Sequence, residues 1–476
     1  MISNKIDNQI VIIGGGLAGC EAAYQLAKEN IKVILYEQKP ENFSKAHTNK
    51  NLAEIVCSNS LKCNLITNAC GLLKEELRHL DSLLIKVADK VKVPSGQALA
   101  VDREEFSKEV TKVIEENPNI EIRRVEVGKD VHLKDLLKDH IVVIATGPLT
   151  SDNLYNEIEE VIGNNDLHFY DAQAPIIEKD SINFDIAFYG NRYDEERPKE
   201  QDIEEWKEQY RKLEQENKVD TSYINLPMNK EEYENFVNEL INAEVVELHE
   251  FEKKEIFEGC MPIEIMAKRG IDTLRYGPLK PMGFTDKNTG VRPYAVVQLR
   301  QDDKIASLYN MVGFQTNLKF GEQKRVFGMI PGLEDANIIK YGVMHRNTFI
   351  NAPVLLDKSF RLKIKHDNNN DLYFAGQITG VEGYVESMAS GMTVAKDIIL
   401  KLRDEKNKID FPDTTMIGSL AEYISNENIK DFQPMNANFG ILKTLDTKIR
   451  DKKQRYEKMA IKSLEDLDDY CKTFKI

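Results

Sequence analysis

The sequence contains little cysteine, almost no tryptophan and no long apolar run. Six of its 476 residues are cysteines and one is tryptophan. The cysteines are too few and too unevenly spaced for a disulfide framework, and no two form the CxxC pair of many metal and redox sites. No apolar run reaches the ~18 residues that a membrane-spanning helix needs, and no signal-type segment precedes the first apolar strand. We therefore expect a cytoplasmic protein without a metal site or a membrane anchor.

Basic charge is also scarce relative to acidic charge. The chain has 64 Lys and Arg residues against 79 Asp and Glu residues, and its formal net charge is -15. A protein that coats nucleic acid through bulk electrostatics carries the opposite sign, so any RNA contact must use local basic patches. The hydrophobic fraction of 41% and the charged fraction of 30% indicate a folded globular protein. The length predicts two or three domains at ~100–200 residues each.

A glycine-rich turn near the N-terminus gives the strongest local signal. An apolar strand over residues 10–13 leads directly into this turn, a helix is predicted over residues 20–29, and a second strand over residues 32–37 ends at an acid. This is the context of a dinucleotide-binding fingerprint, in which N–H groups at the helix N-terminus face the pyrophosphate. The cofactor-binding residues expected here are Gly14, Gly15, Gly16, Leu17, Ala18, Gly19 and Glu37.

The spaced glycines and the acid have different tasks in this fingerprint. Gly14 permits the tight turn, Gly16 lets the backbone approach the pyrophosphate, and Gly19 allows close packing of the helix. Glu37 is placed to accept hydrogen bonds from the ribose hydroxyls of an adenosine.

Two later strand ends favour FAD over NAD. Residues 140–147 and 371–376 are predicted buried strands that each end in glycine, far apart in the sequence. They resemble the second and third cofactor-contacting segments of two-dinucleotide-fold flavoproteins, in which a late glycine-rich turn returns to the flavin. The further cofactor-binding residues expected on this basis are Ala145, Thr146, Gly147, Gly376, Gln377 and Gly380.

The predicted fold class is α/β, with a doubly wound Rossmann-type FAD-binding domain and an α/β insertion domain. Because strands of one sheet lie at both ends of the chain, the FAD-binding domain is predicted to be discontinuous, over residues 1–180 and 324–476. The insertion domain is predicted over residues 181–323. Within it, residues 194–219 are mostly charged or amide-bearing around Trp206, which favours a solvated outer helix. We expect the active site in the cleft between the two domains.

Seven further segments carry a resemblance to one family over nearly the whole chain. They are residues 53–62, 93–103, 257–264, 292–300, 341–351, 381–387 and 433–440. In these segments the sequence resembles the folate- and FAD-dependent RNA (uracil-5-)-methyltransferases, the TrmFO family. The resemblance implies an enzyme that takes a methylene group from methylenetetrahydrofolate onto reduced FAD and delivers it to uracil C5 as a methyl group. It also implies NADPH or NADH as the reductant.

The resemblance gives Cys57 a catalytic role. Uracil C5 is a poor nucleophile until a thiolate adds to C6, so this chemistry requires a reactive cysteine beside the flavin. Cys57 matches one of the family's two catalytic cysteines, and the polar residues 58–60 that follow it can supply hydrogen bonds. A buried cysteine that acts only as a small hydrophobe is the competing interpretation. Cys20, inside the first predicted helix, is expected to be such a core residue.

The sequence departs from the family pattern at Leu226, where relatives carry the second catalytic cysteine. A leucine can neither add to uracil nor move a proton, and the candidates to replace that thiol are Cys63, Cys260 and Glu264. Three explanations stay open. In the first, which we favour, the protein methylates 23S ribosomal RNA, like the ribosomal branch of the family (RlmFO). In the second, it methylates the tRNA T-loop with one cysteine. In the third, it is a flavin oxidoreductase or RNA-binding flavoprotein that transfers no carbon.

Further ligand contacts are expected from three groups of residues. By resemblance, His345, Arg346, Asn347 and Tyr384 lie where folate and flavin meet, and Arg292 and Arg300 can pair with folate carboxylates or RNA phosphates. A basic stretch near the C-terminus is a candidate for phosphate contacts, although a solvated helix face is an equally good interpretation. Its residues are Lys448, Arg450, Lys452, Lys453 and Arg455. Because the target uridine lies in folded RNA, reaching C5 should require extrusion of the base.

Overall fold

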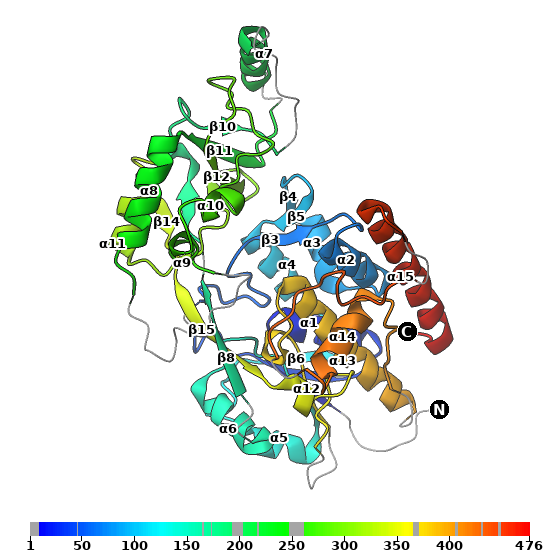
Figure 1. The fold of residues 1–476 in the computed structure, drawn as a ribbon. Coiled ribbons are helices and arrows are strands. Elements are labelled where there is room, and N and C mark those ends of the chain that lie inside the picture. The colour runs from blue at the N-terminus through cyan, green and yellow to red at the C-terminus, as the bar shows by residue number, and fades with distance from the viewer. Residues whose placement is uncertain are drawn as a thin grey trace.

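A computed structural model of the chain describes residues 9–44, 46–163, 166–172, 174–192, 203–216, 219–246, 261–364, 371–404, 408–429, 432–445 and 449–476. For residues 166–172, 214–215 and 344–347 it describes the backbone alone. Figure 1 shows two lobes. The first lobe is built from both ends of the chain and the second from its middle, and each has its own hydrophobic core. A two-stranded antiparallel ribbon of β8 (Asp166–Ala172) and β15 (Met344–Ile350) runs beside them.

The first lobe is organised around a five-stranded parallel sheet. Its strand order is β16-β7-β1-β2-β6, and every adjacent pair is parallel. Apolar runs such as 10–13 and 141–144 form strands of this sheet. A parallel sheet is covered on both faces, so its strands are apolar throughout instead of alternating between apolar and polar residues. The strands are β1 (Ile10–Ile13), β2 (Val33–Tyr36), β6 (Ile120–Arg123), β7 (Ile141–Ile144) and β16 (Leu372–Phe374). The predicted doubly wound α/β fold is confirmed.

Two helices cross closely against this sheet. They are α1 (Leu17–Lys28) and α13 (Tyr384–Arg403). The crossing depends on Gly391, because a Cβ at that position would lie 2.2 Å from the carbonyl oxygen of Ala18. The remaining helices of the lobe are α2 (Ala69–His79), α3 (Leu83–Lys90), α4 (Arg103–Glu115), α5 (Leu133–Asp139), α6 (Asp152–Ile162), α12 (Ala352–Leu355), α14 (Met416–Ser425) and α15 (Lys452–Phe474). A small antiparallel sheet, β3 (Ser60–Cys63), β5 (Ala98–Val101) and β4 (Lys92–Val93), completes it.

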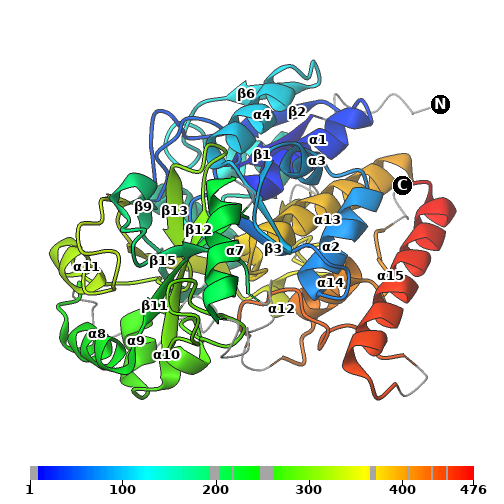
Figure 2. The same ribbon diagram turned by 90° about the horizontal axis from the view of Figure 1, so that it is seen from above.

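A buried carboxylate fixes the C-terminal helices to the first lobe. Glu76, on α2, accepts hydrogen bonds from the backbone N–H groups of Met416 (2.7 Å) and Ile417 (2.8 Å) at the start of α14. It also accepts the hydroxyl of Ser463 on α15 at 2.5 Å. Figures 1 and 2 both show α15 along the edge of the molecule beside α2. Glu76 therefore links three helices that are far apart in the sequence.

The second lobe contains a six-stranded sheet of order β10-β11-β12-β13-β9-β14. Its adjacent pairs are antiparallel. The strands are β9 (Ile176–Glu178), β10 (Phe188–Tyr189), β11 (Tyr223–Met228), β12 (Ala295–Gln301), β13 (Leu308–Met311) and β14 (Ile338–Lys340). Alternate residues of β11 face opposite sides. Ile224, Leu226 and Met228 enter the core of the lobe, whereas Tyr223 and Asn225 are on the other face.

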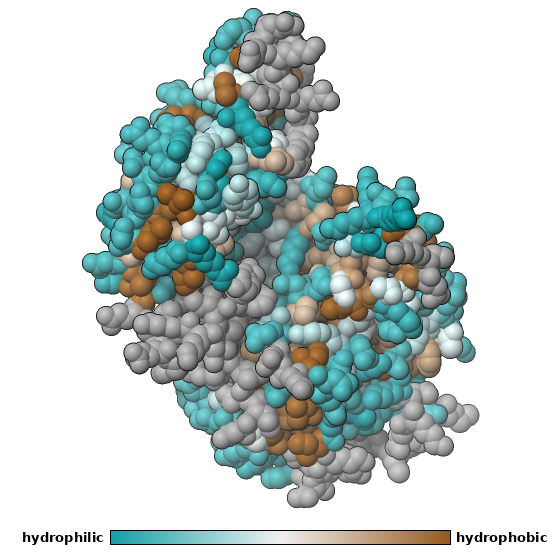
Figure 3. Space-filling view, viewed as in Figure 1, coloured by the Kyte–Doolittle hydropathy of each residue, from teal (hydrophilic) through white to brown (hydrophobic). Residues whose placement is uncertain are grey.

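Among the described helices of the second lobe, four cover its core and one projects away from it. The covering helices are α8 (Lys230–Asn242), α9 (Ile263–Lys268), α10 (Thr273–Tyr276) and α11 (Phe320–Phe327). Helix α7 (Ile203–Gln215), which carries Trp206, lies at the top of Figure 1, outside the sheet, as its polar sequence predicted. In Figure 3 the two lobes are separated by a notch in the surface. Among the described helices, none has the length and apolar character needed to span a bilayer.

Candidate functional site

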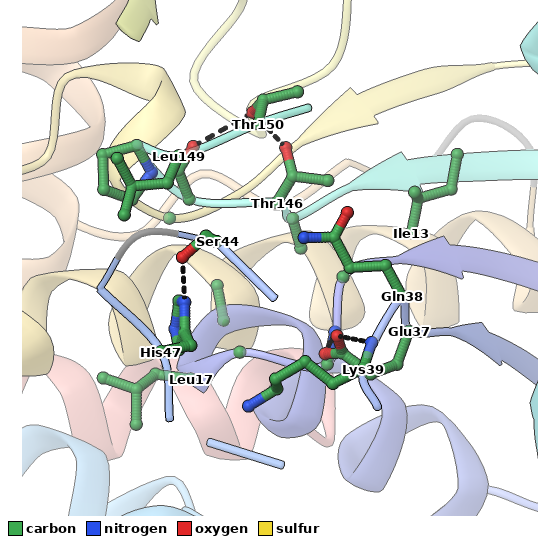
Figure 4. A pocket seen from close by; sticks show the side chains of 18 of the residues that line it. Ile13, Leu17, Glu37, Gln38, Lys39, Ser44, His47, Thr146, Leu149 and Thr150 are labelled. Atoms are coloured by element: carbon green, nitrogen blue, oxygen red, sulfur yellow. Dashed lines mark hydrogen bonds between the residues drawn. The ribbon is translucent and has the colours of Figure 1, made fainter. Parts of the chain in front are cut away.

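A cleft lies at the carboxyl ends of the parallel strands in the first lobe. The empty space between its walls is about 1140 Å³, and part of that space is open to solvent. Figure 4 shows side chains from several of these strand ends converging on it. The wall includes Gly14, Gly15, Gly16, Leu17, Ala18, Glu37, Val56, Ala145, Thr146, Gly147, Gly376, Gln377 and Tyr384.

The backbone of the first turn explains why glycine occupies it. Gly14 has φ +109°, and a Cβ there would lie 2.5 Å from the carbonyl oxygen of Ala145. At Gly19 a Cβ would lie 1.9 Å from the carbonyl oxygen of Gly14, so α1 packs directly on the turn. At Gly16 the nearest atom to an added Cβ is 4.0 Å away, which leaves open space above the helix N-terminus. Among the described residues, no side chain caps that N-terminus.

Glu37 lies at the end of β2 with its carboxylate held inside the cleft. One oxygen accepts the N–H of Gly15 at 3.1 Å and the other accepts the N–H of Lys39 at 2.9 Å. Figure 4 shows the carboxylate beside the glycine turn. Its side chain is therefore oriented by the backbone of the same βαβ unit that forms the cleft.

The two later segments reach the same cleft from the neighbouring strands. Thr146 follows β7, and its hydroxyl forms a 2.7 Å hydrogen bond with the Thr150 hydroxyl. Gly376 follows β16 with φ +81°, and its N–H donates to the Ser390 hydroxyl at 2.7 Å. Gly380 does not line the cleft; it sits against the ring of Phe432, which an added Cβ would approach to 2.5 Å.

These residues fit FAD. The uncapped N-terminus of α1 and the open space at Gly16 suit a pyrophosphate. Glu37 is placed for ribose hydroxyls, and apolar side chains such as Val125 and Val127 line the same wall. The turn at Gly376 brings a further backbone segment to the cleft, beside Ala18.

Cys57 lies next to this cleft, on a segment whose backbone is hydrogen-bonded to Tyr384. The Tyr384 hydroxyl oxygen accepts the N–H of Cys57 at 2.8 Å and the N–H of Ser58 at 3.1 Å. Tyr384 and Val56 line the cleft, and Cys57 itself is half-buried at its margin. Burial raises the pKa of the Tyr384 hydroxyl, so that it stays protonated at neutral pH.

Three cations from different elements contact the segment around Cys57. Arg103, at the start of α4, donates to the carbonyl of Val56 at 3.2 Å and pairs with Asp302 at 2.9 Å. Lys340, on β14, donates to the same carbonyl at 3.4 Å. Arg103 ends one of the segments that carry the family resemblance, but nothing in the sequence placed it or Lys340 beside Cys57, because the fold alone brings them there.

Arg300 is the third cation, and it contacts the residues that follow Cys57. Its guanidinium donates to the Ser58 hydroxyl at 2.5 Å and to the side-chain carbonyl of Asn59 at 3.2 Å. Asn59 is fully buried and donates in turn to the carbonyl of Gln301 at 2.9 Å. Arg300 and Gln301 belong to β12, so the second lobe holds the cysteine segment of the first.

Leu226 and those candidate substitutes for the missing thiol that the structure describes do not line the cleft. Leu226 is fully buried in the core of the second lobe and is absent from the described wall of the cleft. Glu264 is buried and accepts the Thr316 hydroxyl and the Asn317 N–H, so it holds a loop of the second lobe. The backbone carbonyl of Cys63 accepts from Lys74 at the end of β3. Cys260 lies outside the described residues, and Cys20 is buried in the core as predicted.

The other predicted ligand residues are only partly described. His345, Arg346 and Asn347 lie on β15, and their side chains lie outside the described structure. Arg292 is exposed in the second lobe. Lys448 also lies outside the described residues. The rest of its basic stretch is at the start of α15, where Arg450, Lys452 and Lys453 are exposed and Arg455 is half-buried.

The basic residues at the start of α15 surround an aromatic stack. The ring of Tyr456 stacks on that of Phe439 at a centroid distance of 4.1 Å, with Lys452 and Arg455 over it at 5.5 and 5.4 Å. Within the described part of the chain, no acid pairs with Lys452, Lys453 or Arg455. Near the other end of α15, in contrast, lysines pair with acids of the helix itself.

Comparisons with known proteins agree with this geometry. A family profile described as "Glucose inhibited division protein A" matches residues 9–406. A protein of Acetivibrio thermocellus named methylenetetrahydrofolate-tRNA-(uracil-5-)-methyltransferase TrmFO is 51% identical, over 98% of this chain and 99% of its own length. A protein of the same name from Fusobacterium nucleatum is also 51% identical, over 98% of this chain and 100% of its own length. Among solved structures, Aquifex aeolicus GidA shares the fold with a TM-score of 0.65 at 15% identity, over 98% of this chain and 74% of that one.

Proposed function

Because the chain belongs to the GidA family and, within it, to the TrmFO methyltransferases, we propose that it methylates carbon 5 of a uridine in folded RNA. The carbon donor is methylenetetrahydrofolate, and NADPH or NADH supplies the electrons. FAD, when bound in the cleft, would carry the methylene group and provide the reducing electrons. A cleft whose residues fit FAD, with Cys57 at its margin, supports this proposal.

One observation carries this proposal: the cysteine segment and the cleft share Tyr384. Its ring lines the cleft and its hydroxyl holds the backbone of Cys57. A ligand ring in that part of the cleft is therefore adjacent to the segment that carries the thiol. A pyrimidine that approaches the cleft meets Cys57 at its margin.

One residue of this chain reacts with the pyrimidine, and others position it. The Cys57 thiolate adds to uracil C6, which forms the S–C6 bond and moves negative charge to C5 and O4, so that C5 can attack an electrophilic carbon. Tyr384 orients Cys57 through two N–H groups. Arg300 fixes Ser58 and Asn59, the residues that follow Cys57.

Cys57→Ala tests the nucleophile. We expect loss of methyluridine formation by at least ~100-fold, because the activated enolate no longer forms, while the flavin absorbance of the purified protein is retained. Cys471→Ala is a matched control at a half-buried cysteine on α15 that does not line the cleft, and it should retain activity. Full methylation by Cys57→Ala would remove Cys57 from the mechanism. Flavin reduction without any methyluridine in the wild-type protein would favour an oxidoreductase instead.

The RNA substrate is decided by a separate experiment. The relatives reported above are named for tRNA, which favours the T-loop, whereas the leucine at position 226 favours 23S ribosomal RNA, as in the branch of the family that acts there. The buried position of Leu226 takes it away from the described wall of the cleft. Nucleoside analysis of tRNA and of 23S rRNA, from cells with and without the gene, should show methyluridine lost from one pool.

A further inference from the structure

Lys340 is a half-buried cation directly beside the Cys57 segment. Its ammonium group donates to the carbonyl of Val56, the residue before Cys57, at 3.4 Å. No carboxylate among the described residues lies within ion-pair distance of it. Lys340 reaches this position from the edge strand β14 of the second lobe, so the sequence separates it from Cys57 by most of the chain.

The other charges that face this point are already paired or tied. Arg103 donates to the same carbonyl but forms an ion pair with Asp302. Glu54 also faces Lys340, yet it is paired with Lys39 at 3.3 Å. Lys340 is thus a positive charge next to Cys57 that no described carboxylate neutralises.

Two further described groups contact the segment around Cys57. Arg300 is committed to the side chains of Ser58 and Asn59. Tyr384 is neutral at neutral pH, as tyrosine ordinarily is, and burial raises the pKa of its hydroxyl further. Neither group supplies a negative charge that would oppose a thiolate.

We propose that Lys340 keeps Cys57 in the thiolate form. The thiolate is the reactive form of cysteine, and a neighbouring cation stabilises it relative to the thiol. Lys340 is a positioning residue, since it acts through Cys57 and not on the substrate. The assignment rests on the proposed function, in which Cys57 is the nucleophile.

The lysine and the thiolate stabilise each other. Burial, together with the Arg103 guanidinium, lowers the pKa of Lys340, whereas Glu54, Asp302 and Cys57 raise it. A thiolate at Cys57 therefore favours the charged ammonium form of Lys340, which burial disfavours. Loss of either charge leaves the other without compensation in a half-buried place.

Alkylation of Cys57 by iodoacetamide tests the proposal without RNA or folate. The thiolate displaces iodide and forms an S–C bond, so the rate follows the thiolate fraction. The full-length flavin-loaded protein is treated between pH 5.5 and 9.5, and the Cys57 peptide is quantified by mass spectrometry. Cys20 and Cys70 are buried, so their alkylation in the same sample reports unfolding.

Four variants separate charge from hydrogen bonding. Lys340→Gln keeps a donor for the Val56 carbonyl without the charge, Lys340→Met removes both, and Lys340→Arg keeps the charge. We expect Lys340→Gln and Lys340→Met to shift the alkylation profile upward by about one pH unit, which is about tenfold slower reaction at pH 7. Lys340→Arg should follow the wild type. Lys179→Met removes another half-buried lysine of the same lobe, one that faces Tyr189, and should leave the profile unchanged.

Two results would overturn the proposal: a Lys340→Gln profile that superimposes on the wild type, or a Lys340→Arg profile shifted as far as that of Lys340→Gln. The assay also keeps the two proposals apart. If Cys57→Ala still methylates RNA, the nucleophile assignment fails, whereas the alkylation profile still shows what Lys340 does to the thiol.

Discussion

The glycine-lined cleft and the Cys57 segment adjoin each other, yet they are held by different kinds of contact. The cleft is formed mainly by backbone: Gly14, Gly16 and Gly19 shape the turn, and Glu37 is fixed by N–H groups only 2 and 22 residues away. The Cys57 segment is held by side chains that are distant in sequence, from Arg103 to Tyr384. Changes at glycines should therefore damage the cleft, and changes at distant side chains should damage the position of the thiol.

Substitution in the turn should have the largest effect. In Gly14→Ala the new Cβ would lie 2.5 Å from a backbone oxygen at φ +109°, a strain of roughly 2–4 kcal/mol. We expect purified protein without flavin absorbance and with a clearly lower Tm. Gly321→Ala is the control, because no atom lies within 4 Å of the added Cβ, and it should change neither quantity. A flavin-loaded Gly14→Ala protein would contradict the backbone account of the cleft.

Tyr384→Phe should separate the two regions. It removes the acceptor of two N–H groups on a half-buried segment, which costs about 1–2 kcal/mol, and it retains the aromatic ring in the cleft. We expect methylation to fall at least ~10-fold with the flavin content unchanged. Tyr423→Phe removes one hydroxyl hydrogen bond elsewhere in the same lobe and should keep full activity. Equal losses in both variants would show that the effect is not specific to Cys57.

The junction of α2, α14 and α15 is a third region, and it is also held by a side chain that is distant in sequence, that of Glu76. Burial raises the pKa of its carboxyl from 4.5 to about 7. The folded protein therefore binds this proton more tightly than the unfolded chain, and stability falls as pH rises between about 4.5 and 7. Glu76→Gln should abolish this contribution, so the wild type should gain Tm relative to the variant when pH is lowered from 8 to 5.5. In Glu109→Gln, which changes an exposed carboxyl, the Tm difference should not show this rise; the same pH dependence in both would contradict the assignment.

The basic end of α15 should give the smallest effect, because exposed charges are screened by salt. In the double variant Lys452→Gln/Lys453→Gln we expect weaker RNA binding and a salt dependence whose slope is smaller by roughly 2. The control is Lys462→Gln/Lys472→Gln on the same helix, whose ammonium groups are paired with Asp466 and Asp468. Binding curves from 50 to 300 mM salt distinguish the two. An unchanged slope in the first variant would make this helix face a solvated surface only.

Local patterns predicted the frame of the first lobe closely. The strand predicted over residues 10–13 is β1, and those predicted over 32–37 and 140–147 contain β2 and β7. The helix predicted to begin at residue 20 begins at Leu17, because the residues directly after Gly16 already form its first turn. These elements were predictable because an apolar run and a glycine turn act over a few neighbouring residues.

The surroundings of Cys57 could not be predicted in the same way. Its neighbours Arg103, Arg300, Lys340 and Tyr384 are between about 50 and 330 residues away in the chain. No periodicity or spacing connects such positions; only the packing of one lobe on the other does. The buried position of Leu226 was equally hidden, since the sequence shows the missing thiol and not the direction of the side chain.

The strands β9 and β14 flank the middle segment and lie next to each other in the second sheet. An engineer who excised that middle segment and joined its ends would keep every residue of the glycine turn and the whole parallel sheet. The shortened chain would lose β12 and with it the hydrogen bonds from Arg300 to Ser58 and Asn59. Such a shortened protein would keep the contact of Tyr384 with Cys57 but lose the contacts from the second lobe that hold the two residues after it. The position of the thiol in this enzyme therefore depends on both parts of the chain.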